Sequence, residues 1–494
     1  MRPWPRCTQA DPTNNGEPFR ELAPGSLRRG PTVRAPRPER ARRELIGEMR
    51  PFPSLPARAP CAKCVRPPVA AEIPVKIMHM RKRISISDLR IGMFIEEFCG
   101  SWMDHPFWRA HFVVESVNDL ERIHGSGIRE VWIDVSKGLD VESEQIVVAN
   151  LEDAEAEVEQ QLKNVAASAA PRPRREVDKT GELEHAAKII ADSRQVVADM
   201  FGEARLGSVR STDDAATVVD NIANSVARHS AAMIGLVRLK SADDYTFMHS
   251  VAVCALMSAL ARTLELDEAQ IRDAGMAGLL HDVGKAQIPL TVLNKPGTLD
   301  DEEWKTMRSH PERGLAILRG ARGVTPTALD AVLHHHEKVD GSGYPHHLAA
   351  EQIALVAKMC SVCDVYDAIT SDRPYKAGWQ PTIALRKMTE WASGHFDDTI
   401  FKAFVKTVGI YPIGSLVRLE SQRLAVVVEN DPVHLLQPTV KAFFSLRSKM
   451  HIAPSLIKLG GKGSEDRIVG YEDPATHGLT RVDELWLPPG AKAA

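Results

Sequence analysis

The sequence predicts a mainly α-helical protein: a central helical bundle, flanked by a small N-terminal α+β module and a small β-rich C-terminal segment. Within residues 182–408, apolar side chains recur at i+3, i+4 and i+7 intervals, which is the spacing of amphipathic helices. On both sides of this region, short β-branched segments with partial alternation are bounded by turn residues, as expected for strands. With 494 residues, 44% of them hydrophobic and 26% charged, the chain has room for about two to four domains.

Residues 1–79 are expected to be a disordered tail. They hold 15 Lys and Arg against 7 Asp and Glu, together with 15 of the 32 prolines, and they lack a periodic apolar pattern. A second interpretation is that the tail is a start-site artefact, because Met78 and Met80 lie directly before the first patterned segment. Intact-mass measurement of the natively expressed protein distinguishes the two.

Both flanks of the bundle contain strand-like sequence. Residues 80–150 form the predicted N-terminal module, with strand-like segments at 93–99, 112–115 and 129–135. Residues 151–181 are a predicted linker, helical and rich in Glu and Ala at first and then looser around the run PRPRRE. In the predicted C-terminal domain, residues 409–494, the runs SLVRLESQRLAVVVE and PTVKAFFS alternate apolar and polar side chains.

The bundle itself is predicted from helical spacing. The expected helices cover residues 183–201, 218–236, 245–264, 267–282, 301–318, 327–336, 353–371 and 381–391.

We expect a cytoplasmic protein without an integral membrane segment. The longest apolar run, residues 251–261, is interrupted by Ser258 and is shorter than the roughly 20 residues that a membrane-spanning helix needs. The start of the chain lacks the apolar core of a signal peptide. The seven cysteines do not form a secreted disulfide framework, and Cys360 and Cys363 are predicted to pack as small apolar residues in a buried helix.

Residues that ligate metals are densest in the second half of the bundle. The dipeptide His281-Asp282 is followed by His310, by the histidine run 334–336 and by Asp364. Adjacent ligands on one helical turn project about 100° apart, so they can serve two neighbouring ions with the carboxylate as a bridge. Such a mixture of imidazoles and carboxylates suits iron, manganese or zinc better than magnesium. Two ions of this kind favour the hydrolysis of a phosphoester.

Four runs, in order over about residues 243–400, carry a family resemblance. They are HSVAVCALMSALA, AGLLHDVGKAQIPLTVLNKPGTLDDEEWKTMRSHPERG, HHHEKVDGSGYPHHL and CDVYDAITSDRPYKA. Together they resemble the HD-GYP family, a bacterial branch of the HD-domain metal-dependent phosphohydrolases. The resemblance implies an HD-type helical catalytic domain over residues 182–408. It also implies hydrolysis of the second messenger cyclic di-GMP to linear pGpG, with further cleavage to GMP left open.

The resemblance also implies a set of metal ligands. They are His249, His281, Asp282, His310, His335, His336 and Asp364. Taken alone, His249 would be interpreted as an ordinary core residue of its helix. Lys285 matches a lysine that approaches the scissile phosphate, where a cation stabilises developing negative charge. Asp282 and Lys285 are therefore the predicted catalytic residues.

Further matches concern the substrate. Gly343, Tyr344 and Pro345 match the signature loop that lies beside the substrate in this family. Arg373 and Lys376 match basic positions that hold phosphate. The alternative for these two basic residues is a solvated helix end.

One position departs from the pattern of some family members. These members place a glutamate one helical turn before the first histidine ligand, where it holds a third metal, whereas this chain has Tyr245 there. Because a neutral phenol is a poor ligand, we predict two divalent transition-metal ions, iron or manganese. Residues 80–142, with the runs SDLRIGM and DHPFW, resemble a domain of unknown function that commonly precedes HD-GYP modules, and we predict a regulatory role for it.

Two alternatives to this function stay open. A protein of this family can bind cyclic di-GMP without turnover and act as a receptor, but the presence of all seven ligand positions favours catalysis. A related cyclic dinucleotide is the other alternative, since ligands and basic residues do not distinguish the bases. Signalling proteins or a second copy of the chain are the other expected partners, and a nucleic-acid polymer is not expected.

Overall fold

In the computed structural model, the chain falls into two units, residues 1–75 and 76–494. The residues that it describes all lie in the second unit. They are 81–99, 111–126, 128–141, 151–167, 179–239, 245–295, 297, 299–372, 378–431, 434–461 and 466–487. The predicted tail lies outside these residues.

The N-terminal module is a four-stranded antiparallel sheet with one helix. Its strands are β1 (Arg81–Ser85), β2 (Phe94–Cys99), β3 (Phe112–Val113) and β4 (Glu130–Asp134), in the order β1-β4-β2-β3. Helix α1 (Val117–His124) begins with a capping box between Ser116 and Asp119, which satisfies backbone donors that the first turn leaves free. Ile84, Met93, Phe98 and Ile133 are among the side chains that form a small core of its own. The expected α+β module is confirmed.

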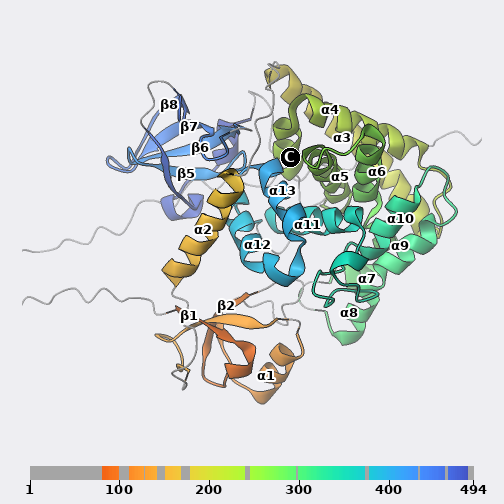
Figure 1. Ribbon diagram of the computed structural model, residues 1–494, viewed down its shortest axis with the longest axis horizontal. Helices are drawn as coiled ribbons and strands as arrows, with labels where there is room; N and C mark the ends of the chain where they lie inside the picture. Colours follow the sequence, from red (N-terminus) through yellow and green to blue (C-terminus); the bar gives the residue numbers. More distant parts are fainter. Residues whose placement is uncertain are drawn as a thin grey trace, which may run out of the picture. The chain divides into compact units, whose positions relative to one another are not determined.

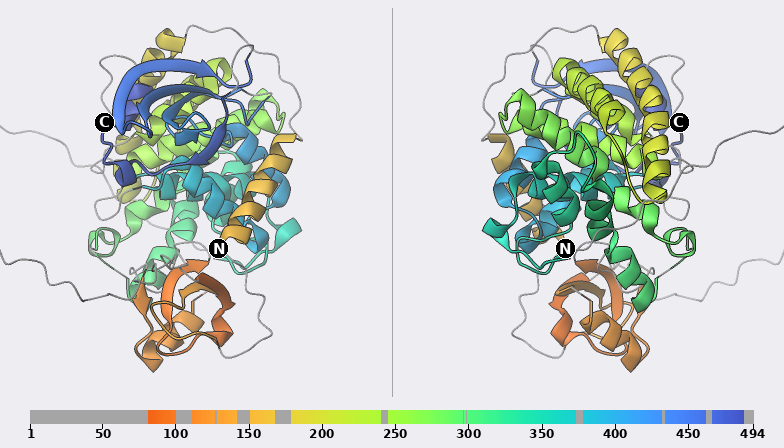
Figure 2. Two further views of the ribbon diagram at one scale, coloured as in Figure 1. Left: turned by 90° about the vertical axis from the view of Figure 1, so that its left-hand side faces the viewer. Right: turned by 90° about the vertical axis from the view of Figure 1, so that its right-hand side faces the viewer.

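Within the part of the chain that the structure describes, the helices α2 to α13 number twelve; they cover the segments predicted for the bundle and add α7 and α13, which were not predicted. Figures 1 and 2 show α3 and α4 side by side as long helices, next to the shorter helices that carry the candidate site. The bounds are α2 (Leu151–Ala167), α3 (Lys179–Arg205), α4 (Asp213–Arg238), α5 (Tyr245–Thr263), α6 (Glu268–Leu280), α7 (Leu290–Leu293), α8 (Asp301–Arg308), α9 (His310–Leu318), α10 (Pro326–His334), α11 (Leu355–Thr370), α12 (Pro381–His395) and α13 (Asp398–Val408).

The prediction of a single helix over residues 301–318 is wrong. The chain forms two helices here, α8 and α9, with Ser309 between them. The physical reason is Pro311: in a continuous helix its ring would clash with the carbonyl of Met307, and it has no N–H to bond that carbonyl. The carbonyl of Met307 instead accepts a hydrogen bond of 2.8 Å from Nδ1 of His310. The break therefore places His310 at the start of a new helix and orients its ring.

Helix α5 lies in the middle of the bundle. It packs against α3, α4, α6, α11 and α13. Thr246–Thr263 is the one candidate membrane span found among the described residues, judged by length and apolar composition, and 78% of this window is buried inside the protein. Cys360 and Cys363, in α11, are fully buried in the same core, as predicted from the sequence.

Part of the predicted linker packs on the bundle. Val158, Leu162 and Val165, on one face of α2, are buried in the same apolar cluster as the bundle helices. Helix α2 contacts α12 and α13. These buried residues of α2 recur at i, i+4 and i+7, which is the spacing of an amphipathic helix that packs one face against a partner.

The C-terminal segment is β-rich, as expected. Five antiparallel strands form a sheet in the order β8-β7-β6-β5-β9: β5 (Leu416–Leu419), β6 (Arg423–Glu429), β7 (Thr439–Ser445), β8 (Met450–Lys458) and β9 (Ile468–Tyr471). The alternation along β6 and β7 separates two apolar clusters, one containing Leu424 and Val426 and the other Ala425 and Val427.

Candidate metal centre

The seven side chains predicted to ligate metal converge in the structure from five segments. His249 lies on α5, His281 and Asp282 follow α6, His310 begins α9, His335 and His336 follow α10, and Asp364 lies on α11. All seven are buried, with at most 7% of each residue exposed. They form two clusters, in each of which one ligand atom per residue lies within 4.8 Å of the others. The three-residue cluster is His249, His281 and Asp364, and the four-residue cluster is Asp282, His310, His335 and His336.

Gly284 and Gly314 allow the ligand-bearing segments to approach each other. A Cβ atom on Gly284, in the run HDVGK, would lie 1.9 Å from the carbonyl oxygen of His310 and 2.5 Å from the backbone nitrogen of Gly314. No side chain fits into that space. The turn with His281 and Asp282 therefore packs directly on α9, which carries His310.

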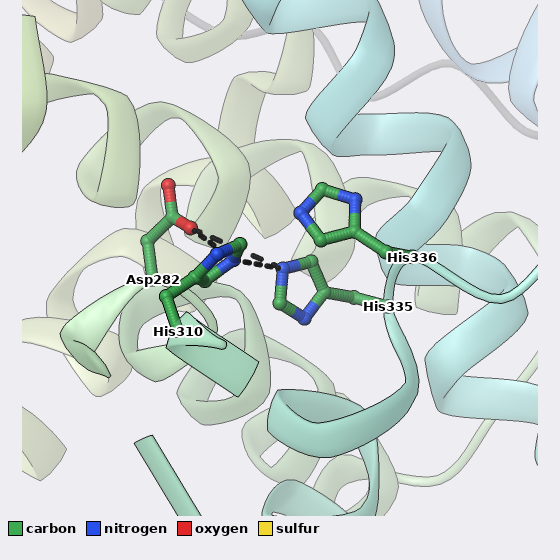
Figure 3. Close-up of side chains that lie close together, drawn as sticks. All are labelled: Asp282, His310, His335 and His336. Carbon is green, nitrogen blue, oxygen red and sulfur yellow. Dashed lines mark hydrogen bonds and ion pairs between the residues drawn. The ribbon is translucent and has the colours of Figure 1, made fainter. Parts of the chain in front are cut away.

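Asp282 lies between the two clusters. Its Oδ2 is 3.3 Å from Nε2 of His281 and 3.5 Å from Nε2 of His249. Its Oδ1 is 3.3 Å from Nε2 of His310 and 3.9 Å from Nε2 of His335. Figure 3 shows the four-residue cluster, with the carboxylate directed at His310 and the ring of His310 directed at His335. One carboxylate thus offers one oxygen to each cluster, which is the arrangement of a bridging ligand.

Hydrogen bonds to the backbone orient three of the imidazoles. Nδ1 of His281 lies 2.8 Å from the carbonyl oxygen of Gly278, and Nδ1 of His335 lies 2.9 Å from that of Val332. His310 makes the corresponding contact with Met307. Because a carbonyl only accepts, Nδ1 carries the proton and the Nε2 lone pair points into the site. This tautomer is the one that a metal ligand requires.

His249 is oriented by a carboxylate instead of a carbonyl. Its Nδ1 lies 2.6 Å from Oδ2 of Asp367, a residue that is 2% exposed and lies one turn after Asp364 on α11. A carboxylate behind a histidine ligand fixes its tautomer and raises its basicity. Sequence reasoning missed Asp367, although its i+3 spacing from Asp364 was a usable signal.

The charges in the site favour a cation. Burial lowers the pKa of His310, lowers that of His335 to about 3 and lowers that of His336 well below its usual value, so these rings are neutral. Burial also lowers the pKa of His281, but the carboxylates of Asp282 and Asp364 outweigh it and raise this pKa to about 10. The centre therefore combines three neutral imidazoles, those of His310, His335 and His336, with two buried carboxylates that attract positive charge, as the raised pKa of His281 shows.

Both carboxyl groups are ionised. Burial alone would raise their pKa values, but Lys285 and His281 hold the pKa of Asp282 well below its usual value, and His249 and His281 do the same for Asp364. Nε2 of His281 and Oδ1 of Asp282 are buried and have no hydrogen-bond partner among the described residues. Buried polar atoms are rarely left without a partner, so these two atoms indicate a ligand for this site. Nitrogen and oxygen donors in this mixture fit a divalent transition metal.

Lys285 lies at the edge of the centre. Its Nζ is 2.6 Å from Oδ2 of Asp282, and 25% of its side chain is exposed. It is therefore placed to contact both the carboxylate and a ligand that enters from solvent. Arg373 and Lys376, the other predicted basic residues, lie outside the described residues, as does the side chain of Tyr245.

The predicted signature loop packs against the four-residue cluster. The ring of Tyr344 stacks on that of His336 with a centroid distance of 4.7 Å, and the peptide bond between Tyr344 and Pro345 is cis. A Cβ atom on Gly343 would lie 2.4 Å from the backbone nitrogen of Lys338, so only glycine fits there.

Glu337 anchors this loop and was not predicted as a site residue. Its carboxylate accepts hydrogen bonds from the backbone N–H groups of His346, at 2.7 Å, and Leu348, at 3.0 Å. Glu337 is 2% exposed. Its position directly after the histidine run was a signal for this role.

A cavity of about 210 Å³ begins at His336. Its lining includes the loop residues Gly343 and Tyr344, and also Trp304 and Arg308 from α8. The candidate metal centre therefore adjoins a cavity that is large enough for an aromatic ring of a ligand.

Comparisons with known proteins agree with this arrangement. Residues 81–215 match the model of a domain of unknown function (DUF3391), and residues 220–400 match that of the HD domain. Over 408 residues the chain is 51% identical to the cyclic di-GMP phosphodiesterase PA4108 of Pseudomonas aeruginosa, a match that covers 82% of this chain and 96% of the relative.

Two other relatives match over shorter segments. The cyclic di-GMP phosphodiesterase response regulator RpfG of Xanthomonas campestris pv. campestris is 40% identical over 177 residues, which cover 35% of this chain and 47% of RpfG. The 3'3'-cGAMP-specific phosphodiesterase 3 of Vibrio cholerae is 33% identical over 170 residues, which cover 34% of this chain and 37% of that protein. This chain thus spans less than half the length of either.

The family resemblance read from the sequence is confirmed for both the N-terminal domain and the helical domain. Because the match to PA4108 extends over nearly the whole of that relative, the chain belongs to the HD-GYP family of HD-domain proteins.

Proposed function

We propose that this protein is a metal-dependent phosphodiesterase that hydrolyses cyclic di-GMP to linear pGpG. The observation that supports the proposal most strongly is the position of Asp282, which faces both clusters of buried ligands. A site built to hold two neighbouring ions suits in-line displacement at a phosphodiester. The name and the 51% identity of PA4108 support cyclic di-GMP as the substrate.

The two clusters define which residues would hold the metals. The three-residue cluster would hold one ion and the four-residue cluster another, with Asp282 shared between them. We propose iron or manganese because five imidazole nitrogens and two carboxylates form the donor set. When bound, the ions supply Lewis-acid activation of water and of the phosphate.

The remaining predicted site residues would position the substrate. The ammonium group of Lys285 would donate to a non-bridging phosphate oxygen, where it stabilises the charge that develops in the transition state. The backbone of the Gly343–Tyr344–Pro345 loop would border the substrate next to His336. Burial of every ligand keeps the site in a low-dielectric environment, which strengthens these interactions.

Other parts of the proposal concern the protein around the site. Residues 182–408 would form the catalytic domain, and residues 80–150 a regulatory module in a cytoplasmic enzyme. Arg373 and Lys376 would hold phosphate. Whether pGpG is released or is cleaved on to GMP is decided by product analysis over the time course.

Turnover of cyclic di-GMP tests the proposal. Anaerobically purified protein, loaded with Mn(II) or Fe(II), is compared with the variant Asp282→Ala, with products identified by mass spectrometry. We expect formation of pGpG by the wild type and none by the variant. The variant Asp301→Ala, which changes an exposed carboxylate on α8, is the control and should keep wild-type activity. Binding without turnover in every metal would indicate a receptor instead.

Metal analysis tests the stoichiometry. Elemental analysis of the same anaerobic preparation should give two equivalents per chain. Three tightly bound equivalents would contradict the proposed two-metal centre.

A further inference from the structure

One wall of the cavity beside the metal centre consists of flat side chains. Trp304 and Arg308 lie one helical turn apart on α8, and the guanidinium carbon of Arg308 is 5.7 Å from the centre of the Trp304 ring. The same carbon is 5.6 Å from the centre of the Tyr344 ring. Tyr344 in turn stacks on His336. These planar groups therefore continue outward from a candidate metal ligand.

Arg308 is available to a ligand. It is exposed, it lines the cavity, and it makes no ion pair with a carboxylate among the residues that the structure describes. Its contacts with the two rings restrain the guanidinium plane but leave its N–H groups without acceptors from those rings. If Arg308 served only to pair with a protein carboxylate, such a carboxylate would lie beside its guanidinium group.

The cavity has the properties of a site for a nucleobase. Its volume of about 210 Å³ exceeds the roughly 150 Å³ of an apolar cavity that admits benzene. Aromatic rings bind bases by stacking, and the partly exposed rings of Trp304 and Tyr344 line this cavity. Lys338 and Ser342, which also line the cavity, add polar groups.

The chemistry of Arg308 selects among bases. Guanine presents two acceptors, O6 and N7, along one edge, and the forked donors of a guanidinium match both of them. Adenine carries an amino donor in place of O6, so the same contact leaves donors facing each other. A point charge such as an ammonium group does not reproduce the fork.

We propose that Trp304, Arg308 and Tyr344 form a guanine subsite, in which Arg308 donates to O6 and N7 of one base of the cyclic dinucleotide. This inference rests on the proposed function, because it assumes a cyclic dinucleotide whose phosphate lies at the metal centre. The matched relatives carry names for cyclic di-GMP and for 3'3'-cGAMP, so the base is a feature in which family members differ. Arg308 thereby sets the preference for guanine in this chain.

The test compares two substrates and three variants. The value of kcat/KM is measured for cyclic di-GMP and for cyclic di-AMP with the wild type, Arg308→Ala, Arg308→Lys and Lys305→Ala. We expect Arg308→Ala to lower kcat/KM for cyclic di-GMP by about 10- to 100-fold and to leave that for cyclic di-AMP nearly unchanged. Arg308→Lys keeps the charge but lacks the forked donors, so it should also lose most of the preference for cyclic di-GMP over cyclic di-AMP. Lys305→Ala, which changes an exposed residue on the same helix, should behave as the wild type.

Other outcomes overturn the subsite. Equal losses for both substrates would show that Arg308 acts on the phosphates, and no loss for either would show that it does not touch the substrate. Equilibrium binding of the two dinucleotides to the same proteins separates this result from the failure of the proposed function. If the wild type binds both dinucleotides without turnover, the proposed phosphodiesterase activity is contradicted. The guanine subsite is then still tested by binding, because Arg308→Ala should abolish the preference for cyclic di-GMP.

Discussion

The two clusters of the metal centre differ in how they are held and in what they face. In the three-residue cluster, a backbone carbonyl orients His281, but His249 is held from behind by a second buried carboxylate, that of Asp367. In the four-residue cluster, His310 and His335 are held by backbone carbonyls, and His336 packs against a loop that lines a cavity. The difference teaches that one cluster is enclosed by the helical core, whereas the other lies at the boundary between the core and a cavity.

The largest effect is expected at Asp282, which belongs to the four-residue cluster and also approaches His249 and His281 of the three-residue cluster. Asp282→Asn keeps the size of the side chain but removes the charge shared by the two sites. We expect the metal content to fall from two equivalents to less than one and hydrolysis to fall below detection. Elemental analysis and turnover measure both quantities. Asp301→Asn is the matched control, and two retained equivalents in Asp282→Asn would refute the bridging role.

Substitutions confined to one cluster should distinguish the contributions of the two clusters to metal binding and to catalysis. We expect His249→Ala and His336→Ala each to retain about one metal equivalent. Each should lower kcat by more than the roughly 100-fold that loss of an outer-shell partner costs. Only His336→Ala should also raise KM, because His336 supports Tyr344 at the cavity. Identical changes in KM for both variants would argue against the assignment of the substrate to the four-residue side.

The carboxylate behind His249 should have a smaller effect. Asp367→Asn removes the charge that orients this ring, and we expect the metal affinity of one site to fall by about 10- to 100-fold. Competition with a chelator measures this affinity. Asp330→Asn is a matched control, because Asp330 bonds Nδ1 of His334, a histidine outside both clusters. An equal loss in both variants would indicate a general effect on the fold.

The smallest effect on the metals is expected at Glu337. Glu337→Gln replaces one carboxylate oxygen by a donor and leaves a backbone N–H of the signature loop without its acceptor. The free energy of unfolding should fall by about 1–3 kcal/mol, as measured by urea denaturation, with both metals retained. Glu351→Gln, at an exposed position, should leave the stability unchanged. Loss of metal from Glu337→Gln would mean that the loop also supports the ligands.

Periodicity predicted much of the fold, and motif order selected seven side chains that the structure brings together. Helical spacing located the bundle helices because an amphipathic helix must bury one face, and this requirement is visible in a local window of sequence. The dipeptide His281-Asp282 predicted a bridging carboxylate from helical geometry alone, and the structure directs the two oxygens of Asp282 to different histidines.

Features that depend on contacts between distant segments were not predicted. The approach of Gly284 to His310 and Gly314 is a contact of two backbones, and neither glycine reveals its partner in the sequence. The role of Asp367 depends on His249, which is 118 residues away along the chain. The break at Ser309 was predictable in principle, because Pro311 marks a helix start, but the apolar spacing continues across it and favoured one helix.

The seven candidate ligands also have a consequence for the lifetime of the protein. Since they come from five segments of the chain, each bound ion would act as a removable cross-link between helices that are distant in sequence. A metal that binds only the folded chain, at about 1,000 times its dissociation constant, adds roughly 4 kcal/mol to the folding free energy. Cellular scarcity of the ion would then deplete the enzyme by proteolysis in addition to stopping its reaction, so that nutrient supply would govern signalling through protein abundance.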